Sequence, residues 1–262
     1  MDLTTMSYEV CDGVAHVRFT NPDGANAVSP AFSRDLRAVT LEVQLDDAVR
    51  AVSVTAEGKV FCAGGDLKLF HAAGDGLPHL AGDMLTDYHG GIYRMNRTPK
   101  PYVAGVRGAA GGAGLSLASA FDLVVSGESA KYTMAYTRAG VTPDGTSTYF
   151  LARHIGLRRA LDLTLTNRVL SATEAEAWGL VNRVVADDEV DTATADLAQS
   201  LADGAAGALG HAKRVIYQGF DRPLEEAGEI EAAAIVAAMG TADGREGIAA
   251  FAEKRSPRFE GS

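Results

Sequence analysis

The stretch "RGAAGGAGLSLASAFD", residues 107–122, contains seven consecutive Gly or Ala residues that start at Gly108. A short apolar segment that is typical of a strand, "YVAGV", precedes it, and "LSLASA" after it favours a helix. Small residues allow a close approach of the backbone to a ligand, and the free N–H groups of a helix start attract an anionic oxygen. The stretch lacks the Gly-Lys-Ser/Thr of a phosphate-binding P-loop. Tight packing of a helix on a strand is the alternative explanation.

A second turn of small residues occurs in "FCAGGDLKLF", residues 61–70. Ala63, Gly64 and Gly65 follow a strand, and Asp66 begins a helical pattern. We expect either a ligand-binding turn or a plain turn in which Asp66 is the N-cap of the helix. Cys62 precedes the turn without an evident neighbouring base, so we expect it to be a packing residue.

Outward from these turns, strand-like and helix-like segments alternate along the chain. The segments are a hairpin around an Asp-Gly turn at 8–19, helices at 29–46 and 79–97, and strands at 51–56, 102–106 and 122–127. After about residue 144 the pattern is mainly helical. We therefore predict an α/β fold of stacked repeats over residues 1–190, followed by a C-terminal helical region over residues 191–262.

Composition narrows the classes of partner. The 262 residues carry a net charge of −10 without a prominent basic cluster, which argues against nucleic acid or a membrane surface as a partner. The chain shows neither a signal-peptide pattern nor an apolar run of about 20 residues, and it has only two cysteines, so we expect a cytoplasmic protein. The histidines lack paired metal-ligand spacing, and we predict no metal site.

Two further residues have both a plain and a catalytic interpretation. Asp144, in "GVTPDGTSTYFLARHIG" at residues 140–156, fits a helix N-cap or a catalytic carboxylate. His89 lies in a predicted helix, where a lone histidine is usually a surface or structural residue.

The two small-residue turns, the Pro-Asp segment and the tail "EGIAAFAEKRSPRFEG" together resemble the crotonase, or enoyl-CoA hydratase/isomerase, superfamily. The resemblance covers nearly the whole chain. It implies a spiral of ββα repeats, a C-terminal region that builds homotrimers or hexamers, and an acyl-CoA thioester substrate, with coenzyme A as part of the substrate and no separate cofactor. It also implies that the N–H groups of Gly65 and Ala113 bind the thioester oxygen.

The resemblance also assigns the catalytic positions. The two glutamates of the family's hydratases match Ser116 and Tyr136, so the usual pair for adding water is absent. Asp144 matches the proton-shuttling aspartate of double-bond isomerases, and we expect an enoyl-CoA isomerase. It also matches the nucleophile of 4-chlorobenzoyl-CoA dehalogenase, whose histidine base matches His89. Two further alternatives are a family member that is named a hydratase but lacks both glutamates, and a member that binds acyl-CoA without turnover.

Residues for binding coenzyme A follow from the same resemblance. Ala25, Ala27 and the turn of residues 63–66 are expected along the pantetheine and adenine, and Tyr136 is expected in the wall of the acyl pocket. Phe251 and Lys254 are expected against coenzyme A bound in a neighbouring subunit. A solvated helix charge is the alternative for Lys254.

Overall fold

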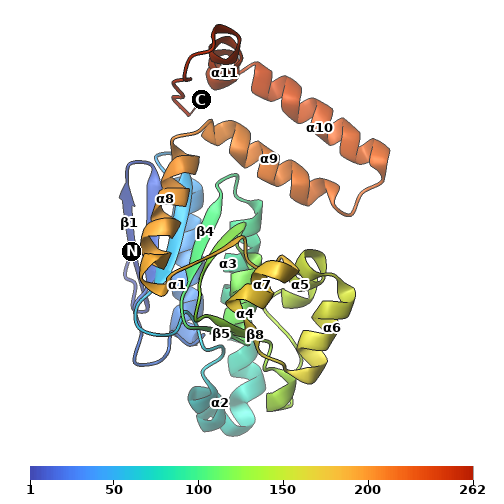
Figure 1. Ribbon diagram of the computed structural model, residues 1–262. Helices are drawn as coiled ribbons and strands as arrows, with labels where there is room; N and C mark the ends of the chain where they lie inside the picture. The colour runs from blue at the N-terminus through green and yellow to red at the C-terminus, as the bar shows by residue number, and fades with distance from the viewer. Residues whose placement is uncertain (262) are drawn as a thin grey trace.

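The computed structural model describes residues 1–261 and contains two sheets surrounded by helices (Figure 1). The larger sheet has the order β1 (Met6–Cys11), β2 (Val14–Phe19), β3 (Ala51–Ala56), β4 (Tyr102–Val106), β6 (Leu123–Gly127) and β9 (Arg183–Val185). Only β1 and β2 pair antiparallel in it. The smaller sheet consists of β5 (Ala109–Gly111), β7 (Lys131–Thr133) and β8 (Leu170–Ser171). The predicted α/β architecture with C-terminal helices is confirmed.

Helices cover both faces of the larger sheet. The main core packs α1 (Pro30–Leu45) and α3 (Leu77–Arg97) on one face, and α8 (Val190–Ala202) packs on the other. Successive strand residues point to opposite faces, so Val52 belongs to the main core while its neighbour Ala51 contacts the α8 cluster. The sheet is therefore buried on both sides, as parallel strands require.

Local signals explain where several elements begin and end. The hairpin turns at Asp12 and Gly13, both with positive φ, and α1 follows Ser29, whose hydroxyl accepts a hydrogen bond from Phe32 N at 3.2 Å. The helix α3 ends at Arg97, shortly before two prolines. These elements confirm the sequence predictions.

The remaining helices form two groups. Those near the smaller sheet are α2 (Leu67–Ala73), α4 (Ala113–Ala120), α5 (Ser147–Ile155), α6 (Leu157–Thr166) and α7 (Ala172–Trp178), with short 3-10 turns at Gly74–Gly76, Thr137–Ala139 and Asp187–Glu189. The helices α9 (Ala206–Gly219), α10 (Leu224–Met239) and α11 (Ala242–Glu253) extend away from the core (Figure 1). Their exposed apolar side chains include Leu224 and Phe251. The trimer or hexamer that would cover such a surface stays a prediction.

The two turns of small residues lie directly against each other. Cys62 N donates to Ala109 O at 3.1 Å, and Gly111 N donates to Cys62 O at 3.0 Å. Gly64 has a φ of +111°, and a Cβ atom there would lie 2.8 Å from Gly111 O. The sequence must keep this position free of a side chain for the backbones to meet.

The substitution Gly64→Ala tests this close approach. It should lower the free energy of unfolding by about 1–3 kcal/mol, because alanine would be strained at this φ and would press on a backbone oxygen. Gly82→Ala is the matched control, since nothing lies within 4 Å of a Cβ atom at this position of α3. That change should be neutral or should stabilise the helix by up to about 1 kcal/mol. Urea unfolding measures both, and equal stabilities of the two variants would contradict the packing described.

Candidate functional site

Asp144 and His89 form a pair. His89, on α3, places Nε2 2.9 Å from Oδ1 of Asp144, which lies in the loop before α5. A carboxylate only accepts, so the imidazole N–H donates. The two side chains keep 27% and 30% of their surface exposed, enough for contact with a ligand. The N-cap of α5 is Thr146, so the cap interpretation of Asp144 is wrong. His89 is half-buried and bonded to Asp144, so it is not a free surface residue, and its catalytic role stays a prediction.

A cavity of about 440 Å³ opens beside this pair. Asp144 is the one carboxylate among the residues that line it within the described chain. The other lining residues are mostly aromatic, apolar or hydroxyl-bearing and come from α3, from the Pro-Asp loop and from α5: His89, Ile92, Tyr93, Asn96, Arg97, Pro143, Thr146, Thr148, Tyr149 and Phe150. The cavity thus combines aromatic and apolar side chains with a few polar ones, and Asp144 and His89 are the acid-base groups in its wall.

Ser116 and Tyr136, the positions that match the hydratase glutamates, bond to each other. Ser116 Oγ lies 2.9 Å from the Tyr136 hydroxyl, which donates to the backbone oxygen of Asp144 at 3.2 Å. Burial raises the pKa of Tyr136 well above its ordinary value. The tyrosine is therefore a neutral hydroxyl at neutral pH, and its contacts hold the Asp144 loop in place.

Gly65 and Ala113 lie in adjoining turns. Ala113 begins α4, where backbone N–H groups have no acceptor within the helix, and its N atom would lie 3.5 Å from a Cβ atom on Gly64. Gly65 is flanked by hydrogen bonds between Val28 and the residues on either side of it. Within residues 1–261, neither the Gly65 N–H nor the Ala113 N–H has a hydrogen-bond acceptor. Two free donors are thus available where an oxyanion could be stabilised.

Sequence reasoning missed Tyr88, the neighbour of His89. Its hydroxyl donates to Ala113 O at 2.7 Å, and its side chain is fully buried. Gly145, with a φ of +63°, packs so closely on Tyr88 and Ser116 that a Cβ atom would lie within 3 Å of each side chain. In sequence, a tyrosine in a predicted helix is indistinguishable from an ordinary core residue, so no signal pointed to this role.

The residues expected along coenzyme A fall into two sets. The segment that holds Ala25 and Ala27 runs beside the second turn, and Ala63 N donates to Ala25 O at 3.0 Å. Asp66 accepts from Leu69 N at 3.0 Å, so its N-cap interpretation is confirmed.

Phe251 and Lys254 lie at the end of α11, and Figure 1 shows this helix at the opposite end of the molecule from α2. Both side chains are exposed, and Phe251 keeps 89% of its surface accessible. One chain therefore does not bring them to the pair of His89 and Asp144. Their expected contact across subunits stays a prediction.

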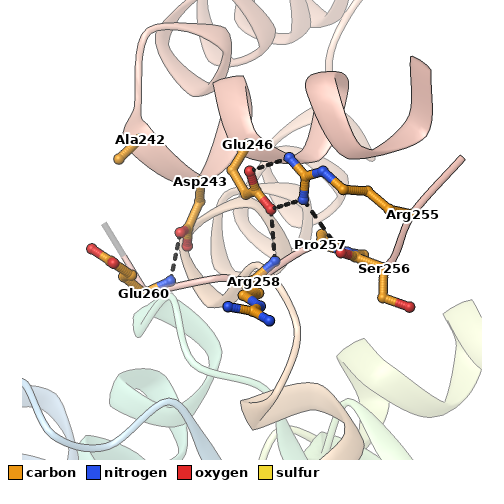
Figure 2. A pocket seen from close by; sticks show the side chains of 8 residues that line it. All are labelled: Ala242, Asp243, Glu246, Arg255, Ser256, Pro257, Arg258 and Glu260. Carbon is orange, nitrogen blue, oxygen red and sulfur yellow. Dashed lines mark hydrogen bonds and ion pairs between the residues drawn. The ribbon is translucent and has the colours of Figure 1, made fainter. Parts of the chain in front are cut away.

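A second pocket, of about 890 Å³, lies between α11 and the C-terminal segment (Figure 2). Three of its charged side chains are engaged with their neighbours: Arg255 pairs with Glu246 at 2.6 Å, and Asp243 accepts from Glu260 N at 2.7 Å. The hydrogen bond from Arg255 lowers the pKa of Glu246 to about 2. These contacts fasten the tail to α11, and the pocket contains none of the expected site residues.

Other candidate groups contribute no chemistry. Burial raises the pKa of Cys62 to about 12, so this thiol is not a nucleophile at neutral pH, and the packing interpretation is confirmed. In the described part of the chain, no group of three or more His, Cys, Asp or Glu side chains could hold a metal ion. No helix within residues 1–261 combines the length and apolarity needed to cross a bilayer.

Comparison with known proteins agrees with the family resemblance of the sequence motifs. The family model of enoyl-CoA hydratase/isomerase matches residues 9–262. The chain is 35% identical to 4-chlorobenzoyl coenzyme A dehalogenase-2 of Arthrobacter sp over 95% of this chain and 91% of that protein. It is 34% identical to 1,2-epoxyphenylacetyl-CoA isomerase of Escherichia coli (strain K12), over 95% of each.

A solved enoyl-CoA hydratase from Polaromonas sp. JS666 superimposes with a TM-score of 0.93 at 30% identity, over 97% of this chain and 99% of that one. The full-length matches in sequence and in structure agree with the motifs described above. The chain therefore belongs to the enoyl-CoA hydratase/isomerase family, within the crotonase superfamily.

Proposed function

We propose that this protein is an acyl-CoA isomerase in which Asp144 moves a proton along the acyl chain. The proposal rests on one observation: Asp144, which bonds to His89, is the one carboxylate among the described residues that line the cavity. Its Oδ1 is engaged by His89, which leaves Oδ2 to remove a proton from the carbon next to the thioester and to return one further along the chain. One group suffices because the second transfer restores the carboxylate.

The first proton transfer creates an enolate, whose negative charge collects on the thioester oxygen. The free N–H groups of Gly65 and Ala113 would bind this oxygen. Loss of one such donor typically costs about 3 kcal/mol of transition-state stabilisation. Tyr88, through its bond to Ala113 O, would keep the second donor in position as the charge develops.

Hydration of a double bond is disfavoured at this site. That reaction needs one group to activate water and another to deliver a proton, and the matched positions carry Ser116 and Tyr136. Because burial raises the pKa of Tyr136, and because Ser116 is fully buried against it, neither acts as a base at neutral pH.

Asp144→Asn tests the proposal. The variant should isomerise 3-enoyl-CoA thioesters to 2-enoyl-CoA at least about 100-fold more slowly, since the amide cannot accept the proton. Asp196→Asn, an exposed position on α8, is the control and should keep full activity. The absorbance of the conjugated product follows the reaction. An Asp144→Asn variant with undiminished turnover would rule out the carboxylate as the shuttle.

Dehalogenase-like hydrolysis is the second candidate, and the contact of His89 with Asp144 favours it. Asp144 would attack the ring carbon of 4-chlorobenzoyl-CoA, chloride would leave, and an aryl ester of the enzyme would form. His89 would then take a proton from water as that water attacks the ester carbonyl, which releases 4-hydroxybenzoyl-CoA and regenerates Asp144. The similarity to 4-chlorobenzoyl coenzyme A dehalogenase-2 supports this candidate.

His89→Gln separates the two reactions. If the protein is an isomerase, wild-type protein should release no chloride from 4-chlorobenzoyl-CoA, and His89→Gln should form no covalent adduct. A dehalogenase would release chloride, and its His89→Gln variant would accumulate an aryl ester on Asp144 that intact-protein mass spectrometry detects. Binding of acyl-CoA without either reaction would identify a member that has lost activity.

A further inference from the structure

Three side chains on one face of α3 lie at increasing distance from Asp144, and His89 is the first of them. The ring of His89 lies 5.8 Å from the ring of Tyr93, and the guanidinium of Arg97 lies 5.8 Å from that same tyrosine ring. These three residues are four apart in sequence, so they share a helix face. Eight residues of helix cover about 12 Å, which is the interval from the pair to the cation.

A second hollow continues the cavity at this end. It measures about 390 Å³ and is lined by Asn96, Arg97, Arg214, Tyr217 and Gln218. Asn96 and Arg97 line both hollows, so the path from Asp144 ends between two arginines, one on α3 and the other on α9.

The helix α9 is anchored where it presents Arg214. The adjacent Lys213 is buried, and its Nζ lies 2.8 Å from Asp122 Oδ2 and 2.7 Å from Met95 O. The ion pair fastens α9 to the segment before β6, and the bond to Met95 O fastens it to the end of α3, which carries Arg97. The two arginines are therefore held by rigid elements on both sides of the hollow.

Both arginines are available to a ligand. Within residues 1–261 neither Arg97 nor Arg214 has an ion-pair or hydrogen-bond partner, although the chain carries an excess of acidic residues. The hollow that they line contains no carboxylate. An arginine pair of this kind suits a carboxylate, which a guanidinium can bind with two hydrogen bonds.

We propose that Arg97 and Arg214 form a subsite for a second, anionic end of the acyl group. The substrates of this class are monothioesters of coenzyme A with dicarboxylic acids. Their thioester would bind at Gly65 and Ala113, and their chain would pass Tyr93 to the arginines. This inference rests on the proposed acyl-CoA function, and it adds the chemistry at the far end of the acyl chain.

Binding measured by calorimetry tests the subsite without any turnover. Suberyl-CoA, the monothioester of octanedioic acid, should bind about tenfold more tightly than octanoyl-CoA, which corresponds to about 1.4 kcal/mol. Replacing both arginines, Arg97→Met with Arg214→Met, should abolish this preference by weakening suberyl-CoA about tenfold more than octanoyl-CoA, because a methyl end makes no ion pair. Arg94→Met is the matched control on α3, since Arg94 bonds to Gln44 outside both hollows and should keep the preference.

Three results would overturn the subsite. Equal affinities of the two thioesters for wild-type protein would show that no anion is recognised there. Equal weakening of both thioesters by the double substitution would mean that the arginines bind the phosphates of coenzyme A. If neither thioester binds at all, both the proposed acyl-CoA function and the subsite are wrong. If both thioesters bind with equal affinity, only the subsite is wrong.

Discussion

The close contact between two backbone turns is the constraint on which the site depends. The turn at Cys62 to Gly65 and the turn at Ala109 to Gly114 exchange hydrogen bonds, and a side chain at Gly64 or Gly114 would collide with a backbone oxygen of the other turn. Only this approach brings the free N–H groups of residues 65 and 113 into adjoining positions. The run of glycine and alanine is thus a requirement of backbone packing, and the proposed anion-binding role of the two N–H groups depends on it.

Two adjacent residues of α3, Tyr88 and His89, connect these two turns to the carboxylate of Asp144. Tyr88 bonds to Ala113 O, and His89 bonds to the carboxylate of Asp144. Gly145 packs against Tyr88, so the loop that carries Asp144 lies directly on the helix. A single helix therefore contacts both the turn that carries Ala113 and the carboxylate of Asp144, and it fixes their relative position.

Local signals explain what the sequence could predict. The hairpin, the cap at Ser29, the end of α3 before prolines and the cap at Asp66 each depend on a few neighbouring residues. Local signals do not predict contacts between distant segments. His89 and Asp144 are 55 residues apart, and their bond depends on the rotation of α3 about its axis. The resemblance to the family indicated both residues, but their direct contact required the folded chain. The hydroxyl of Tyr88 could not be anticipated, since its partner is a backbone atom.

In the proposed reaction, Asp144 acts as a base on the carbon next to a thioester whose oxygen is held by the free backbone N–H groups. The most direct measurement is deuterium exchange into phenylacetyl-CoA in D₂O, followed by NMR, because this thioester has acidic protons at that carbon and no double bond to move. The wild-type protein should catalyse the exchange, and Asp144→Asn should catalyse it at least about 100-fold more slowly. Exchange at the same rate in both proteins, or none in the wild type, would contradict the account.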